Sequence, residues 1–594
     1  MNKNKIIFGC LAGLSLLSTS VLTGCGDKFQ EEYPWMIGKQ EDQDQDQEDG
    51  AGRYDMTVLE QELRGAIPYM LNYSHEPDGS WQPHNYQYQR ANNIDNYCGY
   101  WTTSKATFGF GGALPTLLTY PNDYLDGPFD NSVFTQSYDA LHFAVDMKDK
   151  NDETKIVASR PEWRAVALII QAYMGHEVVD FIGACPYNDW RERVRNRSHV
   201  YEAGPDVYAQ IFDDLDEAVS LLKETQPDRE ALARIEDFEG NKSISDGDWR
   251  RWVKFANSIK LRMAMNMVKY DAATAQAKAL EAVNDEIGVL VEGDRDIAYN
   301  PSLGNGNSWY FIGNVWNDIR LNANMEIILK HFNHPVISHW FDANPYPIIN
   351  KLTGEVAPTD VYGIRAGISM NSKNTGNKDK GVYSAFSTLQ QRSMPMPFLK
   401  TSEVLFLRAE GALRGWAMGG TAKEFYEAGI RTVFTENALD GYEDYIAQDE
   451  LPVVDYVDPY DSENNTPGRV SIGVKWNESD SKEVCLEKII TQKWIACFPL
   501  GAEAWTTFRR TGYPRLIPCK INGMADMGVD LELQIRRIPR VVSTNNTAEM
   551  NSLGQAIGGD QKDLSIRVFW DVPTERRGNV NPENNTPYVI PVNF

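Results

Sequence analysis

Beyond the first residues of the sequence we expect no stretch that is apolar enough and long enough to cross a membrane. A transmembrane helix needs about 20 consecutive apolar residues, and the apolar run from Ile6 to Leu17 is shorter than that. Lys3 and Lys5 precede this run, and Leu22-Thr23-Gly24-Cys25 follows it. Basic residues, a short apolar region and small residues before a cleavage point are typical of a secretory signal. We therefore predict a signal peptide over residues 1–24 and no later membrane span.

Basic residues are also scarce in this sequence. The 594 residues include 58 Lys and Arg against 83 Asp and Glu, which gives a formal net charge of −25. A charge of this sign repels phosphate backbones and anionic lipid surfaces. Nucleic acid is therefore excluded as a partner.

The cysteines do not suggest a disulfide framework. Leu22 to Cys25 resembles the bacterial lipobox, in which the cysteine becomes the lipidated N-terminus after cleavage. Seven cysteines are present, and removal of Cys10 with the signal and lipidation of Cys25 leave five, an odd number. Cys485 and Cys497 lie twelve residues apart in a helical pattern, so they cannot chelate a metal as a C-x-x-C pair would. We expect the remaining cysteines to be single buried thiols.

Catalytic, metal-binding and cofactor motifs are missing as well. In the segment His176 to Asp180, an aspartate stands where a zinc-protease helix carries its second histidine. The glycines of Gly109 to Gly112 follow no convincing strand and lack the third glycine of a dinucleotide motif. Counting carboxylates in so acidic a chain neither supports nor excludes a glycosidase pair. We predict no catalytic residues, no metal site and no cofactor.

An acidic, low-complexity run follows the proposed lipidation site. Residues 40–50 alternate acids with glutamines and contain no apolar surface to bury, so they should remain solvated. Read as a calcium loop that starts at Asp42, the run has Gln47 at the glycine position and Arg53 at the bidentate position, which argues against calcium. We predict a lipidated tether over residues 25–52 and a folded domain over residues 53–594.

Helical periodicity dominates the folded region and comes in pairs. Thr421 and Glu424 form a predicted capping box, and Gly419-Gly420 breaks the chain before it. The eight predicted helices cover residues 161–179, 205–222, 249–270, 272–283, 401–416, 421–434, 481–498 and 501–510. Four helix hairpins with apolar stripes on facing sides predict a mostly α fold with tetratricopeptide-like stacking, although no fixed repeat is visible.

The segments between and after the helix pairs are rich in loop residues. Residues 285–396 contain many Gly, Asn, Pro and aromatic residues without sustained periodicity. Loops of this length in a compact domain usually carry function. We predict a helical scaffold over about 160–284 and 400–510. A loop-rich ligand-binding lobe is predicted over about 70–130, 285–396 and 511–594.

Aromatic residues outside the helical stripes give the positive signal for function. Flat rings in Asn-rich loops can stack on sugar faces while amides and hydroxyls bind the sugar hydroxyls. Trp309, Tyr310 and Trp316 stand among glycines and asparagines, and we expect Trp309 and Trp316 to be solvent-reachable. The rings between Tyr86 and Trp101 could instead pack the lobe. The predicted ligand-binding residues are Trp81, Tyr100, Trp101, Trp309, Tyr310, Asn314 and Trp316.

Several blocks of the sequence resemble the SusD/RagB family of outer-membrane nutrient-binding lipoproteins. They occur in the family's order and span nearly the whole chain after the signal. These blocks are the lipobox at Cys25, 84–101 (HNYQYQRANNIDNYCGYW), 252–265 (WVKFANSIKLRMAM), 403–413 with Arg408-Ala409-Glu410, 488–509 (KIITQKWIACFPLGAEAWTTFR), 537–540 and 568–571.

The resemblance implies a specific biological setting. Family members use four tetratricopeptide-like hairpins as scaffold and sit over a SusC-like TonB-dependent outer membrane transporter. Asp27, Glu31 and Glu32 resemble the signal that sends such lipoproteins to the outer face of the membrane. The expected function is capture of a nutrient oligomer, most readily an oligosaccharide. A peptide ligand and a surface glycoside hydrolase remain alternatives, and no ligand-contact motif of the family can be transferred to this chain.

Overall fold

The computed structural model describes a mostly helical protein. All described residues fall in one compact unit, Leu63–Phe594. They are residue 63 and residues 86–91, 93–104, 160–191, 198–236, 244–299, 308–368, 382–387, 395–538 and 547–594. The predicted signal peptide, the lipidation site Cys25, the tether and the Gly109 to Gly112 segment lie outside this part of the chain.

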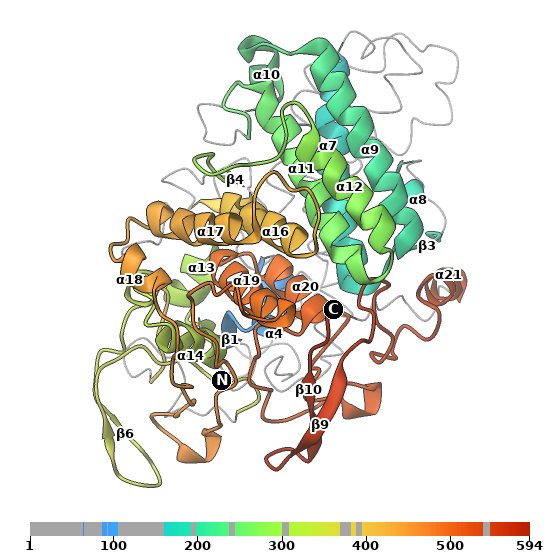
Figure 1. The fold of residues 1–594 in the computed structure, drawn as a ribbon. Coiled ribbons are helices and arrows are strands. Elements are labelled where there is room, and N and C mark those ends of the chain that lie inside the picture. The colour runs from blue at the N-terminus through green and yellow to red at the C-terminus, as the bar shows by residue number, and fades with distance from the viewer. Residues whose placement is uncertain are drawn as a thin grey trace, which may run out of the picture. The chain divides into compact units, whose positions relative to one another are not determined.

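Two helix pairs form the first half of the scaffold, and they run side by side in Figure 1. Helix α7 (Pro161–Ile182) packs on α9 (Gly204–Thr225), and α11 (Trp249–Asn266) packs on α12 (Ala272–Asn284). Helix α11 also contacts both α7 and α9, which joins the pairs. All four predicted helices are confirmed. The third ends earlier than predicted, because the chain tightens into a 3-10 turn at Met267–Lys269.

The second half of the scaffold is built in the same way. Helix α16 (Thr401–Leu413) packs on α17 (Ala422–Glu436), and α19 (Lys482–Ala496) contacts α16, α17 and α20 (Gly501–Thr511). The predicted capping box is confirmed, since Glu424 N donates to Thr421 Oγ1 at 3.2 Å and Thr421 N donates to Glu424 Oε2 at 2.8 Å. Helix α16 ends three residues before the predicted Trp416.

Helix α7 differs from the amphipathic helix that the sequence predicts. It is long and apolar enough to cross a membrane, and its apolar window is fully buried inside the protein, so it is a core helix. The expectation that no segment after the signal is apolar enough for a span was therefore wrong. The polar residues of α7 are accommodated by partners: Glu177 pairs with Arg90 at 2.6 Å, and Asp180 accepts a hydrogen bond from Tyr208.

The strands in the described part of the chain are short and antiparallel. They occur only as two-stranded ladders, so the regions between the helix pairs remain irregular. The ladders are β1 (Trp101–Thr103) with β5 (Ile319–Leu321), β2 (Ala184–Cys185) with β3 (Glu202–Ala203), β4 (Ile297–Tyr299) with β8 (Met396–Leu399), β6 (Ile348–Ile349) with β7 (Val356–Ala357), and β9 (Arg576–Asn581) with β10 (Thr586–Ile590).

Several shorter helices lie outside the scaffold pairs. One of them, α14 (Ala323–His331), falls in the segment that was predicted to lack periodicity. Its residues are buried on nearly every side, so no amphipathic stripe could reveal it. The others are η1 (Gln87–Ala91), α4 (Ile94–Tyr97), α8 (Tyr187–Arg191), α10 (Arg229–Ile235), α13 (Ser308–Tyr310), η6 (Phe311–Val315), α15 (Ile337–Trp340), α18 (Tyr442–Ile446), η7 (Ser462–Asn464), η8 (Ala525–Met527) and α21 (Thr547–Ile557).

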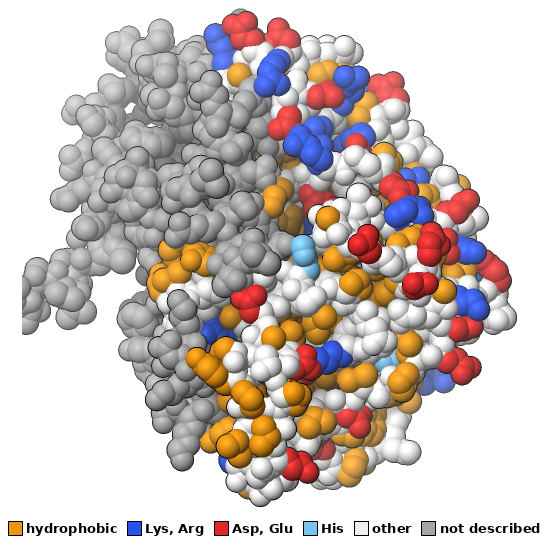
Figure 2. All heavy atoms as spheres, turned by 90° about the vertical axis from the view of Figure 1, so that its left-hand side faces the viewer, with side chains coloured by type: hydrophobic (Ala, Val, Ile, Leu, Met, Phe, Trp, Pro, Cys, Tyr) orange, Lys and Arg blue, Asp and Glu red, His pale blue; other side chains and the backbone are white. Residues whose placement is uncertain are grey.

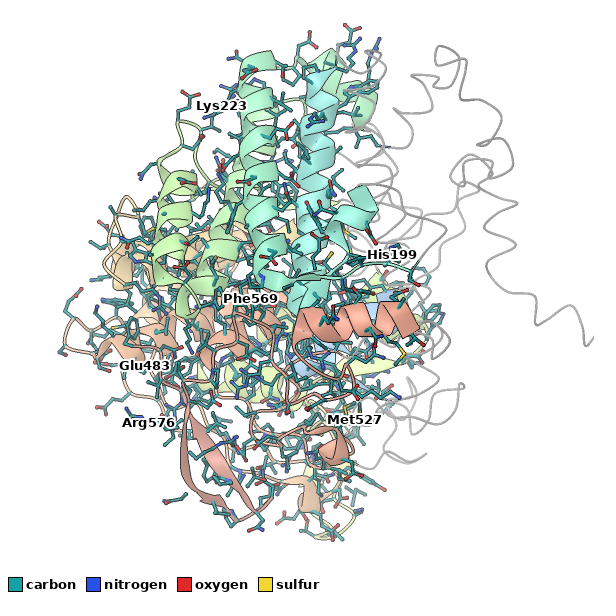
Figure 3. All side chains as sticks on the ribbon, turned by 90° about the vertical axis from the view of Figure 1, so that its right-hand side faces the viewer. His199, Lys223, Glu483, Met527, Phe569 and Arg576 are labelled. Carbon is teal, nitrogen blue, oxygen red and sulfur yellow. The ribbon has the colours of Figure 1, made fainter. Side chains whose placement is uncertain are left out.

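The C-terminal segment returns to the first helix pairs. The ring of Phe569 packs edge-on against Tyr208 of α9, at a centroid distance of 4.9 Å, and against Tyr270 at 5.0 Å (Figure 3). Nearby, Trp570 Nε1 donates to Asp180 Oδ1 at 2.7 Å. Contacts between residues so far apart in sequence tie the C-terminal segment to the helical scaffold.

The cysteines in the described part of the chain behave as predicted. Cys98, Cys185, Cys485, Cys497 and Cys519 are free and buried. Burial raises the pKa of the Cys519 thiol to about 12. These thiols therefore stay protonated and act as small apolar side chains.

Candidate ligand-binding site

The segment that carries Trp309, Tyr310, Asn314 and Trp316 has an unusual backbone. Helix α13 runs directly into η6, a π-helical turn in which Trp316 N donates to Phe311 O at 2.8 Å. Asn317 then adopts a left-handed conformation with φ of 58°, and the chain enters strand β5. Such π-turns occur frequently at functional sites. The π-turn contacts β5, and Asp318 N just before the strand donates to Ile312 O of the turn at 2.8 Å.

Trp309 anchors the start of the segment in the core. Its ring packs edge-on against Tyr86, with the centroids 5.2 Å apart, and is only 1% exposed. Tyr86 Oη donates to Asp95 Oδ2 at 3.1 Å. Burial raises the pKa of Asp95 to about 7, while Arg90 and hydrogen bonds from Tyr86 and Trp309 act in the opposite direction. These contacts leave Trp309 no surface for a ligand.

Arg320 and Asp318 fix the other end of the segment. Arg320 Nη1 donates to Gly313 O at 2.5 Å, and Nη2 donates to Asn317 Oδ1 at 2.6 Å. Gln87 lies in the other π-helix, η1, and its Nε2 donates to Asp318 Oδ2 at 2.7 Å. Burial lowers the pKa of Arg320 to about 10, so the guanidinium still carries its charge near neutral pH. The turn is therefore held by charged and polar contacts at its base.

Between these anchors the chain presents an uncharged surface. Tyr310, Asn314 and Trp316 are partly exposed, and Val315 is 48% exposed. Asn314 Nδ2 donates to Phe386 O at 2.9 Å, which orients its amide. Asn314 Oδ1 is buried, so the groups on this surface that could meet a ligand are the partly exposed indole and phenol, which can stack on a sugar ring. Because residues 308–317 carry no charge, this surface favours a neutral ligand.

Three of the predicted ligand-binding residues are instead part of the core. Tyr100 and Trp101 are fully buried. Tyr100 Oη donates to the carbonyl of Trp494, and the ring of Trp101 packs on Phe498 at 5.7 Å. Together with buried Trp309, they were wrongly expected to offer rings to a ligand. Tyr310, Asn314 and Trp316 remain candidates, and Trp81 lies outside the described residues.

Sequence reasoning missed the residues that support the turn. Arg320, Asp318 and Gln87 come from two distant segments, and their side chains meet only because β1 pairs with β5 through Trp101 and Leu321. No local pattern marks them. An aspartate before and an arginine within the short strand β5 were the available signal, but such residues are equally typical of an exposed strand.

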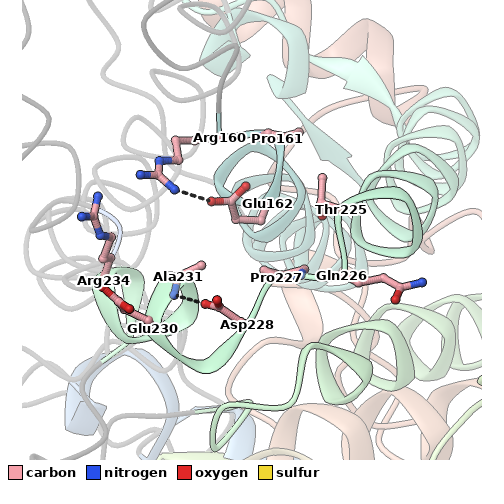
Figure 4. A pocket seen from close by; sticks show the side chains of 10 residues that line it. All are labelled: Arg160, Pro161, Glu162, Thr225, Gln226, Pro227, Asp228, Glu230, Ala231 and Arg234. Carbon is pink, nitrogen blue, oxygen red and sulfur yellow. Dashed lines mark hydrogen bonds and ion pairs between the residues drawn. The ribbon is translucent and has the colours of Figure 1, made fainter.

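A cavity of about 550 Å³ lies elsewhere, at one end of α7, α9 and α10 (Figure 4). Burial raises the pKa of Glu162 at its wall, and Arg160 Nη1 lies 3.8 Å from Glu162 Oε1. Its lining has no aromatic ring, so it cannot stack a sugar. The lining residues are Arg160, Pro161, Glu162, Thr225, Gln226, Pro227, Asp228, Glu230, Ala231 and Arg234.

Two ionisable side chains of helix α7, His176 and Asp180, are part of the packed core. Burial raises the pKa of Asp180 to about 7 and lowers the pKa of His176 to about 4. Both side chains are almost completely buried. Within the described residues no group of three or more His, Cys, Asp or Glu could hold a metal ion. The His176 to Asp180 segment therefore lies in the packed core of the fold.

Comparison with known proteins identifies the family. A family model described as SusD-like, "Susd and RagB outer membrane lipoprotein", matches residues 45–571. The chain belongs to the SusD and RagB family. The SusD-like fold, the outer-membrane location and a role in binding nutrients at the surface follow for this protein.

Solved structures of SusD homologues share this fold. A chitin-binding SusD homologue from Flavobacterium johnsoniae has 30% sequence identity and a TM-score of 0.71, over 87% of this chain and 99% of that chain. SusD homologues from Bacteroides thetaiotaomicron and Bacteroides uniformis each have 28% identity and a TM-score of 0.71, over 87% of this chain and 99% and 100% of theirs. No curated protein matches the chain.

Proposed function

We propose that this SusD-like protein captures an uncharged oligosaccharide through the surface formed by Tyr310, Asn314 and Trp316. The observation that carries the proposal is the π-turn, which presents the two partly exposed rings of Tyr310 and Trp316 beside Asn314 without a charged residue. The chitin-binding relative, at 30% identity, supports a glycan as the ligand class. Chitin itself is a neutral polymer of amide-bearing sugars, which fits this chemistry.

The binding test is substitution of the exposed rings. Replacing Trp316 with Ala should weaken glycan binding by about 1–3 kcal/mol if the ring is an interface anchor. The free energy of unfolding should change by about 1 kcal/mol or less, because the ring is only partly buried. Calorimetric titration of the purified domain with a panel of neutral oligosaccharides, chitin fragments included, measures the first quantity, and urea unfolding measures the second.

A matched control keeps this test specific. Tyr270 is an exposed ring on the scaffold, and Tyr270→Ala should leave binding unchanged. If Trp316→Ala and Tyr310→Ala both bind the glycan with wild-type affinity, the site lies elsewhere. If both variants lose folded structure as well as binding, Trp316→Phe, which keeps a ring, separates the two effects.

Peptide capture is the second candidate function. An extended peptide could also lie across aromatic rings and amides. The absence of charge between residues 308 and 317 disfavours charged peptides, and a neutral glycan should bind almost independently of salt. If only peptides release heat in the calorimetric titration, or if the affinity falls steeply with salt concentration, a peptide is the favoured ligand.

We also propose that a SusC-like TonB-dependent transporter is the importing partner and that lipid on Cys25 anchors the protein at the outer face of the membrane. In this proposal the protein binds without cleaving its ligand. Product formation from any bound oligosaccharide, abolished by replacing one carboxylate, would instead indicate a hydrolase.

The anchor can be tested independently of the ligand. Replacing Cys25 with Ala should release the protein from the membrane fraction and leave its unfolding midpoint unchanged, because Cys25 lies in the predicted tether. Fractionation of cells followed by immunoblotting measures this. Sedimentation of most of the Ala variant with outer membranes would contradict lipid as the main anchor.

A further inference from the structure

The β6–β7 hairpin exposes more apolar surface than its neighbours. It projects at the lower left of Figure 1, away from the helix pairs, and comprises residues 345–358. Ile349 and Val356 are directly paired across the two strands and are 65% and 62% exposed. Tyr346 and Leu352 are 58% and 54% exposed. Figure 2 looks onto this side of the molecule and shows hydrophobic side chains gathered on the lower part of the face.

The alternation of the strand explains why one face is left uncovered. Ile348 points inward and is 6% exposed, within a small core cluster that includes Tyr362 and Tyr383. Its neighbour Ile349 must point to the opposite face. An aliphatic pair on the outer face of a two-stranded ladder stays in water, so it gains little stabilisation from burial when the protein folds. Exposed apolar surface of this kind marks an interaction site.

The hairpin is held in place before any partner binds. Asn350 Oδ1 accepts the backbone N–H groups of Leu352 at 3.0 Å and Thr353 at 3.1 Å. Lys351 N donates to Tyr460 O at 2.8 Å, and Lys351 Nζ lies 2.5 Å from Asp461 Oδ2. A surface that is already ordered loses little conformational entropy on binding.

The charge of the hairpin restricts what can cover it. Lys351 and Glu355 are its only charged residues, and Lys351 is paired with Asp461. The one cationic side chain of the hairpin is therefore already paired with a carboxylate, and the net charge of −25 repels an anionic lipid surface. The outward-facing side chains of Ile349 and Val356 lack the donors and acceptors that hold a sugar. An uncharged, apolar patch on another protein is the complementary surface.

The proposed tether makes such a second contact useful. An extended chain spans about 3.3–3.6 Å per residue, so the predicted tether over residues 25–52 could reach roughly 90–100 Å. Lipid at Cys25 would therefore keep the protein near the membrane without setting which face it turns to its importer. A contact made by the folded body has to set that orientation.

We infer that residues 345–358 form a docking surface for the outer-membrane importer, which covers Ile349, Leu352 and Val356 with an uncharged apolar patch. The inference rests on the proposed function for the existence of that importer, and it adds the surface that the importer contacts. In this arrangement the importer does not cover the candidate ligand surface at Tyr310, Asn314 and Trp316.

Immunoprecipitation of the full chain from detergent-solubilised outer membranes of its own organism tests the inference. The TonB-dependent transporter recovered with it is identified and quantified by mass spectrometry. Ile349→Asp and Val356→Asp should each reduce the recovered transporter at least about tenfold, because a charge must be desolvated in an apolar contact. Val580→Asp is the matched control: Val580 lies on β9, is 52% exposed, and should leave recovery unchanged.

The outcomes separate the inference from the proposed function. If the wild-type protein recovers no TonB-dependent transporter, the proposed partner is wrong and the inference falls with it. If the wild type recovers a transporter and both hairpin variants recover as much, only the docking surface is overturned. Loss of self-association or of binding to lipid vesicles in the variants, with transporter recovery intact, would assign the hairpin to a second copy or to lipid and also overturn the inference. Glycan binding by the isolated domain should be the same in all variants.

Discussion

Replacing Arg510 with methionine is expected to lower the free energy of unfolding by about 3–5 kcal/mol, the usual effect of leaving one member of a buried ion pair without its partner. Arg510 and Glu410 join α20 to α16 through two hydrogen bonds, Nη1 to Oε1 and Nη2 to Oε2, both 2.6 Å long. Their side chains are 0% and 1% exposed. Urea unfolding followed by tryptophan fluorescence measures the loss.

A pair near the surface provides the control for this prediction. Arg431 Nε lies 2.6 Å from Glu292 Oε1, but these side chains are 44% and 43% exposed. Arg431→Met should therefore change the free energy of unfolding by about 1 kcal/mol or less. Equal losses for Arg510→Met and Arg431→Met would contradict the view that burial makes the first pair important.

The Arg510–Glu410 pair should also make the free energy of unfolding depend on pH. Burial acts to raise the pKa of Glu410, but Arg510 and Arg414 outweigh it and hold this pKa at about 2. A carboxyl whose folded pKa lies below its unfolded value binds fewer protons in the folded state. Its contribution is therefore complete above about pH 4.5 and is lost as the pH falls towards 2. The difference in unfolding free energy between wild type and Arg510→Met should shrink over this range. A constant difference would contradict the assignment.

Replacing Trp309 with alanine is expected to lower the free energy of unfolding by about 3–5 kcal/mol, the usual effect of removing a fully buried tryptophan. The ring is 1% exposed and packs against Tyr86 in the layer that encloses Asp95. Denaturant unfolding of Trp309→Ala beside Trp316→Ala measures the contrast between a core ring and a surface ring seven residues apart. A small change for Trp309→Ala would return this residue to the candidate ligand surface.

Glycan affinity of the Trp309→Ala protein provides the complementary measurement. Where the variant remains folded, any loss of affinity should be smaller than that of Trp316→Ala. If Trp309→Ala does not fold, Trp309→Phe keeps most of the buried area and allows the titration. Affinity that falls further for Trp309→Phe than for Trp316→Ala would contradict the placement of Trp309 in the core.

Much of the scaffold could be predicted because its signals are local. The apolar stripe of Ile211, Leu215 and Leu222, and the capping box at Thr421, depend only on neighbours within a few turns. Helix α7 shows where this reasoning weakens. Because it is buried on nearly all sides, its sequence lacks the polar face that distinguishes a surface helix from a membrane span.

The candidate site was only partly predictable for a related reason. Trp309, Tyr310 and Trp316 look alike in sequence, each an aromatic residue among glycines and asparagines. Their different exposure follows from their places in the fold: Trp309 lies in α13 and packs against Tyr86, whereas Trp316 follows the π-turn and is partly exposed. Tyr100 and Trp101 were misjudged likewise, since their partners Trp494 and Phe498 lie nearly 400 residues further along the chain.

The sequence by itself determined the helical scaffold, the acidic character of the protein and the family to which it belongs, since these depend on periodicity, composition and the order of short blocks. Only the tertiary structure decided which aromatic rings face solvent, which arginines and acids hold the turn before β5, and that the β6–β7 hairpin exposes Ile349 and Val356. The physical reason is that exposure is a property of long-range packing. An aromatic or aliphatic side chain is driven equally to any apolar surface it can reach, and the fold alone determines which surface that is.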